Sequence, residues 1–485
     1  MDQNIKKDIS FGTDGWRGII GIDFNFQNLS KVVLAACQEL NCQYFNKVKT
    51  SKILIGYDRR FMAFEFAESI IPVVKGAGFE PVLTSTYVTT PSCSFYAKEF
   101  KFLGALVITA SHNPFNWLGL KIKSFQGCSV DKSFTEKVQK RINLGNKIEM
   151  QYGSYEKVNV KDYHLEKIKS QFDVDFIVKK LNEMNIRVFV DSMHGSSAKS
   201  IEKIFNNQEK IAVQGIRENR DPYFGGNPPE PLFNYLNNLI QVLEKNSTNG
   251  NKTLGIIFDG DGDRIAVIDE KGRYCSTQVL LPYFINYLGN KNNNLFPVLK
   301  TVSGSDIVRK ISETQKRDVY ELPVGFKYIA EKMIEENIFI GGEESGGIGF
   351  GSFLPERDAL YAAMVLLNGI AEQSKYLYQS LNEIQERFGP SFYDRVDKKF
   401  INESEKNNIK NYISKNMPNK ICGKKVLNIS KQDGIKLRIS DNYWVLFRFS
   451  GTEPLLRLYC EAPSKNELEE TLAWCNDFIN RIDNV

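Results

Sequence analysis

The sequence has few of the residues that build zinc sites and disulfide frameworks. It contains only three histidines, and none of its eight cysteines forms a Cys-x-x-Cys pair with another. Structural zinc sites need Cys and His ligands at close spacing, and disulfide frameworks belong mainly to small secreted domains. Neither class fits this chain. We expect reduced, mostly buried thiols at Cys37, Cys42, Cys93, Cys128, Cys275, Cys422, Cys460 and Cys475.

Long apolar runs and a large excess of one charge are also missing. The start of the chain lacks the apolar segment of a signal peptide, and the longest apolar runs elsewhere are too short to span a bilayer. A net charge of +5 on 485 residues is small, so charge supports neither a nucleic-acid partner nor a membrane surface. We therefore expect a cytoplasmic protein with no nucleic-acid and no membrane partner.

The chain has instead the composition of a soluble globular protein, with 42% hydrophobic and 25% charged residues. Its length favours about three or four domains. Residues 53–56 and 103–108 are predicted strands, and residues 61–74 between them are predicted to be mostly helical. This alternation indicates a mostly parallel sheet with helices on its faces.

The pattern of strand, polar loop and helix recurs later in the chain. Residues 187–190 and 298–302 are predicted strands, and helices are predicted over residues 196–205 and from residue 306 onward. Recurrence at such wide intervals suggests a repeated α/β domain. The charged stretch 146–162 is predicted to be a linker.

The character of the sequence changes after residue 389. Two predicted strands, 443–449 and 455–461, are joined by a Ser-Gly-Thr-Glu-Pro turn and followed by a predicted helix over residues 465–481. This order suits a small α+β domain on an antiparallel sheet. The asparagine- and lysine-rich segment 402–420 is predicted to be its exposed surface.

A serine follows the predicted strand 103–108, in the segment Thr109-Ala110-Ser111-His112-Asn113-Pro114. The ends of strands are where α/β proteins place their chemistry. A serine hydroxyl is a poor nucleophile unless a base, a metal or nearby charge activates it. The alternative is a turn in which Ser111 only makes local hydrogen bonds. The rest of the chain has to decide between them.

The strongest chemical signal is Asp259-Gly260-Asp261-Gly262-Asp263-Arg264, which lies between two predicted strands. Three carboxylates at alternate positions repel one another unless a cation lies among them, and the glycines let the loop fold tightly. An EF-hand does not fit, because Arg264 takes the place of the turn glycine and strands flank the loop. A set of few carboxylate ligands favours Mg²⁺ over Ca²⁺. An acidic turn without metal is the alternative.

Two further loops carry donors for a phosphorylated sugar. The segment 448–454, Arg-Phe-Ser-Gly-Thr-Glu-Pro, with Arg457 beyond it, offers the guanidinium, hydroxyl and backbone N–H donors that bind phosphate. The segment 341–347, Gly-Gly-Glu-Glu-Ser-Gly-Gly, offers acidic and hydroxyl groups that suit sugar hydroxyls. Each could also be a structural turn. The segment 11–18, Phe-Gly-Thr-Asp-Gly-Trp-Arg-Gly, is a similar donor-rich turn.

Taken together, these loops resemble the α-D-phosphohexomutases, the family of phosphoglucomutase, phosphomannomutase and phosphoglucosamine mutase. The match runs from Gly12 to Arg457 with all four signature loops in family order. The resemblance implies an α/β fold of three related mixed-sheet domains and a C-terminal α+β domain around a central cleft. We place these domains at residues 1–155, 156–272, 273–388 and 389–485.

The resemblance also implies a role for each matching residue. Ser111 would be the phosphoserine and a metal ligand, together with Asp259, Asp261 and Asp263. Further catalytic residues would be Lys121, Lys327 and Arg17, and Thr109, His112, Asn113 and Arg264 would complete the centre. The implied sugar-binding residues are Gly325, Glu343 and Ser345, and the implied phosphate-binding residues are Arg448, Ser450, Gly451, Thr452 and Arg457.

The implied reaction interconverts hexose 1-phosphate and hexose 6-phosphate, with Mg²⁺ as cofactor and hexose 1,6-bisphosphate as intermediate and primer. The segment Pro323-Val324-Gly325-Phe326-Lys327 and the doubled glutamate at 343–344 resemble glucose-type members. Glucose is therefore the predicted sugar, with mannose and glucosamine as alternatives. A metal-dependent phosphatase and a non-catalytic relative are more distant alternatives, and the presence of Ser111 and all three aspartates argues against the second.

Overall fold

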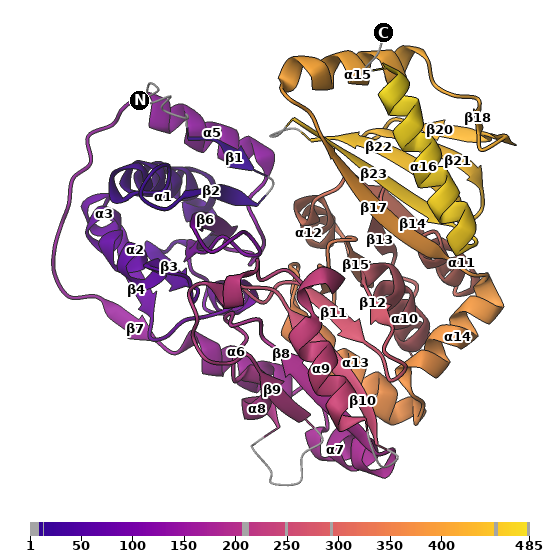
Figure 1. Cartoon of the computed structure of the whole chain (residues 1–485). Helices are drawn as coiled ribbons and strands as arrows, with labels where there is room; N and C mark the ends of the chain where they lie inside the picture. Colours follow the sequence, from indigo (N-terminus) through magenta and orange to yellow (C-terminus); the bar gives the residue numbers. More distant parts are fainter. Residues whose placement is uncertain are drawn as a thin grey trace. The chain divides into compact units, whose positions relative to one another are not determined.

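The computed structural model describes residues 9–12, 14–205, 213–247, 251–291, 294–450 and 454–482. The chain divides into two compact units, and three segments far apart in sequence build each of them (Figure 1). The first unit comprises Met1–Thr277, Gly325–Ile338 and Ser345–Tyr378. The second comprises Gln278–Val324, Phe339–Glu344 and Gln379–Val485.

The first unit begins with a mixed sheet of seven strands. Strands β3, β4 and β5 are parallel neighbours, and β6 runs antiparallel to β5. In sheet order the strands are β1 (Phe11–Gly12), β2 (Gly15–Ile19), β6 (Trp117–Ser124), β5 (Gly104–Ile108), β3 (Lys52–Tyr57), β4 (Glu80–Thr84) and β7 (Glu156–Val158). The helices are α1 (Phe26–Val48), α2 (Ala63–Ser69), α3 (Ile71–Gly76), α4 (Thr90–Glu99) and α5 (Lys132–Asn143).

The first unit also holds a mixed sheet of five strands in the order β12-β11-β10-β8-β9. These are β12 (Tyr274–Cys275), β11 (Ile265–Ile268), β10 (Lys252–Phe258), β8 (Ile186–Asp191) and β9 (Val213–Ile216). The helices are α6 (Val160–Lys169), α7 (Val174–Glu183), α8 (Ser200–Ile204), α9 (Asn237–Asn246), α12 (Phe326–Glu335) and α13 (Ala359–Gln373). The first unit also includes strand β16 (Ile348–Phe350), which is not part of this five-stranded sheet, and the 3-10 turns η1 (Phe224–Gly226) and η2 (Phe233–Tyr235).

The second unit contains parallel strands, a larger antiparallel sheet and a short two-stranded sheet. Strands β14 (Val319–Leu322), β13 (Val298–Thr301) and β15 (Ile340–Gly342) are parallel neighbours, with α10 (Thr277–Gly289), α11 (Ile307–Thr314) and α14 (Leu377–Phe388). The antiparallel sheet has the order β17 (Phe392–Lys399), β23 (Leu455–Ala462), β22 (Tyr443–Phe449), β21 (Ile435–Ser440) and β20 (Asn428–Ser430). Helices α15 (Glu403–Lys415) and α16 (Lys465–Ile482) and the short pair β18 (Lys420–Ile421) and β19 (Lys424–Lys425) belong to this C-terminal region.

Local sequence explains where the elements that carry the site begin. Strand β5 is an unbroken apolar run, buried at every position, as expected for a strand covered on both faces. Helix α4 begins after Thr89, whose hydroxyl accepts a hydrogen bond from the Ser92 N–H. Helix α5 begins after Asp131, whose carboxylate accepts from the Phe134 N–H. These caps fix the two helix starts that flank the loop of Ser111.

The predicted fold class, α/β domains with mixed sheets and a C-terminal α+β domain, is confirmed. The four domain ranges stay a prediction. None of the described helices is long and apolar enough to cross a membrane.

The stretch 61–74 is mostly helical, as predicted, but it forms two helices, α2 and α3, because Pro72 favours the start of a second one. Two local predictions were wrong. The predicted linker 146–162 includes β7, which pairs with β4, and the first turn of α6. The predicted helix 196–205 is only the short α8. The segment 402–420 is mostly exposed, as predicted, although it holds α15, which buries Ile409 and Ile413.

Candidate active site

Ser111 lies in the loop that follows β5, and its side chain is buried. Its backbone has a φ of +51°, a left-handed conformation that is unfavourable for a residue other than glycine. The Ser111 N–H donates to the Thr109 hydroxyl at 2.9 Å. The Ser111 hydroxyl donates to Asp259 Oδ2 at 2.9 Å and lies 3.3 Å from His112 Nδ1. Strained backbone of this kind is often found at functional sites.

Arg60 holds the main chain of this loop in place. Its terminal nitrogens donate to the carbonyl oxygens of Ser111 at 2.6 Å, Asn113 at 2.7 Å and Pro114 at 2.8 Å. The guanidinium is fully buried, and Asp58 lies 3.3 Å from its Nε. Sequence reasoning missed Arg60, because an isolated arginine after a strand has no motif that marks it.

The three aspartates lie together on the loop between β10 and β11. Ligand oxygens of Asp259, Asp261 and Asp263 are all within 4.8 Å of one another, and all three residues are buried. The loop also approaches the serine closely: a Cβ added at Gly260 would come within 2.4 Å of the Ser111 carbonyl oxygen. Glycine at this position therefore allows the serine and aspartate loops to meet.

The hydrogen bonds of the aspartates show which oxygens are committed to protein donors. Lys121 Nζ lies 2.8 Å from Oδ2 of both Asp261 and Asp263. The Thr90 hydroxyl also donates to Asp261 Oδ2, and Arg357 Nη2 donates to Asp263 Oδ2 at 2.8 Å. Oδ1 of Asp261 and Oδ1 of Asp263 are buried without a hydrogen-bond partner.

Two buried carboxylate oxygens without donors fit a divalent cation, because burying an unpaired charged oxygen is costly. Burial raises the pKa of Asp259 well above its usual value, and the charges of Asp263 and Asp261 raise it further. A cation among the three would favour their ionised forms. The residues present therefore fit Mg²⁺, with Asp259, Asp261, Asp263 and the Ser111 oxygen as its predicted ligands.

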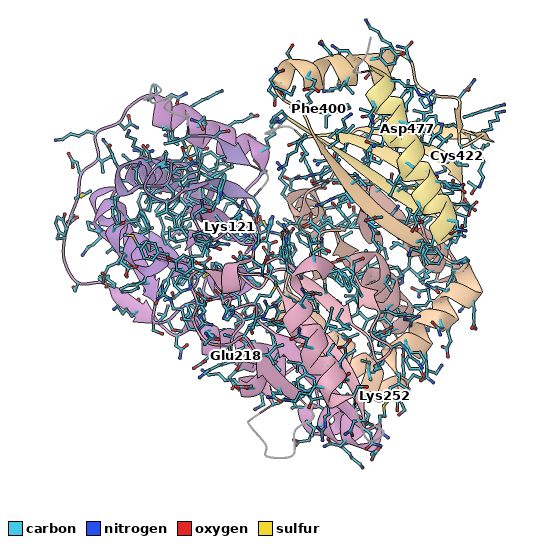
Figure 2. The ribbon with its side chains drawn as sticks, in the orientation of Figure 1. Lys121, Glu218, Lys252, Phe400, Cys422 and Asp477 are labelled. Atoms are coloured by element: carbon cyan, nitrogen blue, oxygen red, sulfur yellow. The ribbon has the colours of Figure 1, made fainter. Side chains whose placement is uncertain are left out.

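Basic side chains surround this acidic centre. Lys121, labelled in Figure 2, lies on β6 and also reaches Asp14 Oδ2 at 2.7 Å. Burial alone would raise the pKa of Asp14, but the charges of Lys121, Lys123 and Arg357 hold it well below its usual value. Arg357 Nη2 lies 2.8 Å from Asp14 Oδ2, and neither Asp14 nor Arg357 was predicted to be a site residue.

Arg17 contacts the serine loop, and Arg264 lies near the aspartates. Arg17 Nη1 donates to Asn113 Oδ1 at 2.5 Å. Arg264 Nε lies 3.9 Å from Asp263 Oδ1 and 4.0 Å from Asp259 Oδ2. Burial, and then the charges of Arg264 and Arg17, lower the pKa of His112 well below its usual value. The lowered pKa favours the neutral form of the His112 ring.

The remaining predicted residues are distributed over both units. In the first unit, Lys327 is the second residue of α12, which begins after Gly325. Lys327 lines a small pocket with Asp14, and burial lowers its pKa. Ser345 also lies in the first unit. In the second unit, Glu343 is buried after β15, and Arg448 lies directly across from Arg457 on β22 and β23, with Ser450 just beyond β22. Gly451 and Thr452 lie outside the described residues.

The structure thus assembles Ser111, Thr109, His112, Asn113, Arg17, Lys121 and Arg264 around the three aspartates within one unit. It also adds Asp14, Arg60, Thr90 and Arg357 to that group. The catalytic and binding roles of all these residues stay predictions.

Thr90→Val should weaken Mg²⁺ binding about tenfold or more, because residues that orient a metal ligand typically contribute this much. Valine keeps the shape of threonine but cannot donate to Asp261. Activity measured against Mg²⁺ concentration should show the shift. Ser94→Ala is the matched control, since it removes another buried hydroxyl of α4 that has no hydrogen-bond partner. An unchanged Mg²⁺ requirement in Thr90→Val would contradict the assignment of Asp261 as a ligand.

Comparisons with known proteins agree on one family. Four family models, described as phosphoglucomutase/phosphomannomutase α/β/α domains I, II and III and C-terminal domain, match residues 8–149, 162–272, 278–388 and 395–473. A phosphoglucosamine mutase from Nautilia profundicola is 29% identical, with 96% of this chain and 98% of the relative aligned. A phosphoglucomutase/phosphomannomutase from Thermococcus kodakarensis is 25% identical, with 95% and 96% aligned.

The fold agrees with a solved structure as well. A crystal structure from Thermus thermophilus, of a protein named provisionally as a phosphomannomutase, superposes with a TM-score of 0.84 and 27% identity. The superposition covers 98% of this chain and 100% of the other.

Proposed function

Because the chain belongs to the phosphoglucomutase/phosphomannomutase family and is an intramolecular phosphotransferase of that type, we propose that it moves a phosphoryl group between the 1- and 6-hydroxyls of a hexose through Ser111. The observation that supports this most is the Ser111 hydroxyl, buried and bonded to Asp259 within a three-aspartate cluster that has two unpartnered oxygens. Ser111 is then the phosphoserine, and hexose 1,6-bisphosphate is the intermediate and primer.

The chain's own residues account for the transfer. The bond from phosphorus to Ser111 Oγ breaks as a bond to the sugar hydroxyl forms, and the hydroxyl proton passes to a base. Lys327 Nζ is our candidate for that base, because burial lowers its pKa toward the neutral amine. Mg²⁺, when bound, withdraws charge from the phosphoryl group. Ser111 Oγ gains one proton as it leaves, balancing the proton that the sugar hydroxyl loses, and the resulting hydroxyl donates to Asp259 Oδ2 until the bisphosphate returns a phosphoryl group.

Glucosamine phosphate is the substrate we propose, in place of glucose phosphate. The prediction of glucose depended on two short segments of the sequence, whereas several of the similar relatives are named phosphoglucosamine mutases. These include proteins from Finegoldia magna, at 26% identity, and Nautilia profundicola, at 29%. A phosphoglucomutase from Staphylococcus haemolyticus is also similar, at 23% identity, so glucose phosphate remains the second candidate.

A comparison of four substrates should show this preference. With Mg²⁺ and the matching bisphosphate primer, kcat/KM for glucosamine 1-phosphate should exceed that for glucose, mannose and N-acetylglucosamine 1-phosphate by about tenfold or more, as expected when a site binds a polar group that its competitors lack or block. A higher value for glucose would restore the prediction from sequence. No turnover of any of the four would contradict the proposed function.

A further inference from the structure

The C-terminal antiparallel sheet has two very different faces. Helices α15 and α16 cover one face, where Val445, Phe447, Leu458 and Cys460 belong to an apolar core (Figure 1). Side chains alternate between the two faces along each strand. The neighbouring positions on β22 and β23 therefore point away from these helices. They carry a smaller apolar cluster that includes Trp444, Leu446 and Tyr459, and beside it charged residues.

Strand register places three arginines on that second face. Arg448 on β22 lies directly across from Arg457 on β23. Arg457 lies across from Asp397 on β17, and Arg395, two residues before Asp397, lies across from Tyr459. Residues that are opposite one another or two apart share a face and lie within reach of long side chains. Arg395 therefore shares its face with the two arginines of the predicted phosphate loop.

Burial and electrostatics show that the three guanidiniums lie close together. Tyr459 is fully buried, and the side chains of Arg395, Arg457 and Arg448 are 32%, 30% and 14% exposed. Burial and the charge of Glu344 raise the pKa of the Tyr459 hydroxyl, and the charges of all three arginines oppose this rise. The guanidiniums thus lie near one phenol oxygen, and each of them is still partly open to a ligand.

The acids in this cluster contact one edge of the arginines. Asp433 Oδ2 accepts from Arg448 Nε at 2.9 Å, and Asp397 Oδ1 lies 3.1 Å from Arg395 Nε. Glu344, whose charge also acts on Arg395, accepts a hydrogen bond from the Ser303 hydroxyl at 2.6 Å. An acid that contacts Nε fixes the orientation of the guanidinium. The terminal nitrogens can then bind phosphate oxygens in pairs.

A fully satisfied ion-pair network would be the alternative, but the described residues do not form one. Arg457 Nε is buried without a hydrogen-bond partner, and the nearest carboxylate oxygen recorded for it, Asp397 Oδ2, is 3.9 Å away. Three carboxylates lie beside the three arginines, but a buried guanidinium donor left unpaired still favours an anion at this face.

We propose that Arg395 is a third phosphate-binding arginine, whose guanidinium donates to the hexose phosphate that is not being transferred, together with Arg448 and Arg457. This inference rests on the proposed function, because it takes the ligand to be a sugar phosphate. It adds a residue from β17, outside the segment 448–457 that carries the predicted phosphate loop.

Arg395→Ala should raise KM for both glucosamine 1-phosphate and glucose 1-phosphate about tenfold or more, the loss expected for one charge-assisted hydrogen-bonded pair. The inhibition constant of inorganic phosphate should rise by a similar factor. Arg395→Lys should recover only part of this, because lysine keeps the charge and loses the paired donors. The matched control is Lys398→Ala, which also removes a positive charge from β17. The Lys398 side chain lies on the other face of the sheet, where it donates to Asn480 of α16.

KM values for Arg395→Ala within about twofold of the control, well short of the loss expected for a charged pair, would overturn the inference. If Arg448→Ala raises KM in that case, the proposed function stands and only the role of Arg395 fails. If the wild type turns over no hexose phosphate, the proposed function fails instead. If the melting temperature shows that Arg395→Ala does not fold, Arg395→Gln takes its place, because glutamine keeps most of the side chain. Its KM values are then compared with those of the control in the same way.

Discussion

Ser111→Ala is expected to lower kcat by at least about 10³-fold, because removing a covalent nucleophile removes the reaction path itself. The loss should appear in both directions and with every hexose phosphate that the wild type uses. Steady-state assays with purified variant and saturating primer would measure it. The melting temperature should stay close to that of the wild type, because alanine fits where serine stood.

Ser192→Ala is the control for this variant. Ser192 is also a buried serine that follows a parallel strand, β8, and none of the described contacts joins it to the aspartate cluster. It should keep activity near that of the wild type. Substantial turnover by Ser111→Ala, with the control unaffected, would mean that another group carries the phosphoryl.

Removal of divalent metal is expected to lower activity by about a hundredfold or more, since a metal that stabilises transition-state charge contributes several kcal/mol. A cation would counter the raised pKa of Asp259, which comes from burial and from the charges of Asp263 and Asp261, and would occupy the buried oxygens of Asp261 and Asp263 that have no hydrogen-bond partner. Activity would be measured after treatment with excess EDTA and again after Mg²⁺ is restored.

Recovery with Mg²⁺ should be complete, and circular dichroism before and after EDTA should show whether the fold survives. Asp261→Asn should need more Mg²⁺ than the wild type for the same activity, because the site loses one formal charge. Full activity in excess EDTA would contradict a catalytic role of the aspartate loop.

Much of the site was predictable because its chemistry is concentrated in short segments. The aspartates alternate with glycines between two apolar strands, and this local pattern alone indicates a cation. The structure shows the same loop between β10 and β11, beside the serine that lies far away in sequence. The serine was marked by its position after a buried strand.

The missed residues share one property: each acts from a distant part of the chain. Arg60 reaches Ser111 across 51 positions, Thr90 reaches Asp261 across 171, and Arg357 reaches Asp14 across 343. A single polar residue leaves no periodic signal, so only the folded arrangement reveals these contacts.

The local errors in the fold have similar causes. Strand β7 has three residues, mostly exposed, which is too short for alternation to show. Helix α15 is strongly polar and buries only a few residues, Lys406, Ile409 and Ile413, so its composition predicted an exposed surface and did not mark a helix. In both cases tertiary contacts stabilise an element that the local sequence barely marks.

The most direct test follows one phosphoryl group from the enzyme to the sugar. Enzyme phosphorylated by excess hexose 1,6-bisphosphate and then freed of it should carry one phosphoryl group, mapped to Ser111 by peptide mass spectrometry. Mixing it with glucosamine 6-phosphate in a single turnover should empty Ser111 and produce glucosamine 1,6-bisphosphate, without release of inorganic phosphate. Release of inorganic phosphate instead would identify a phosphatase. A phosphoryl group found on a residue other than Ser111 would contradict the account.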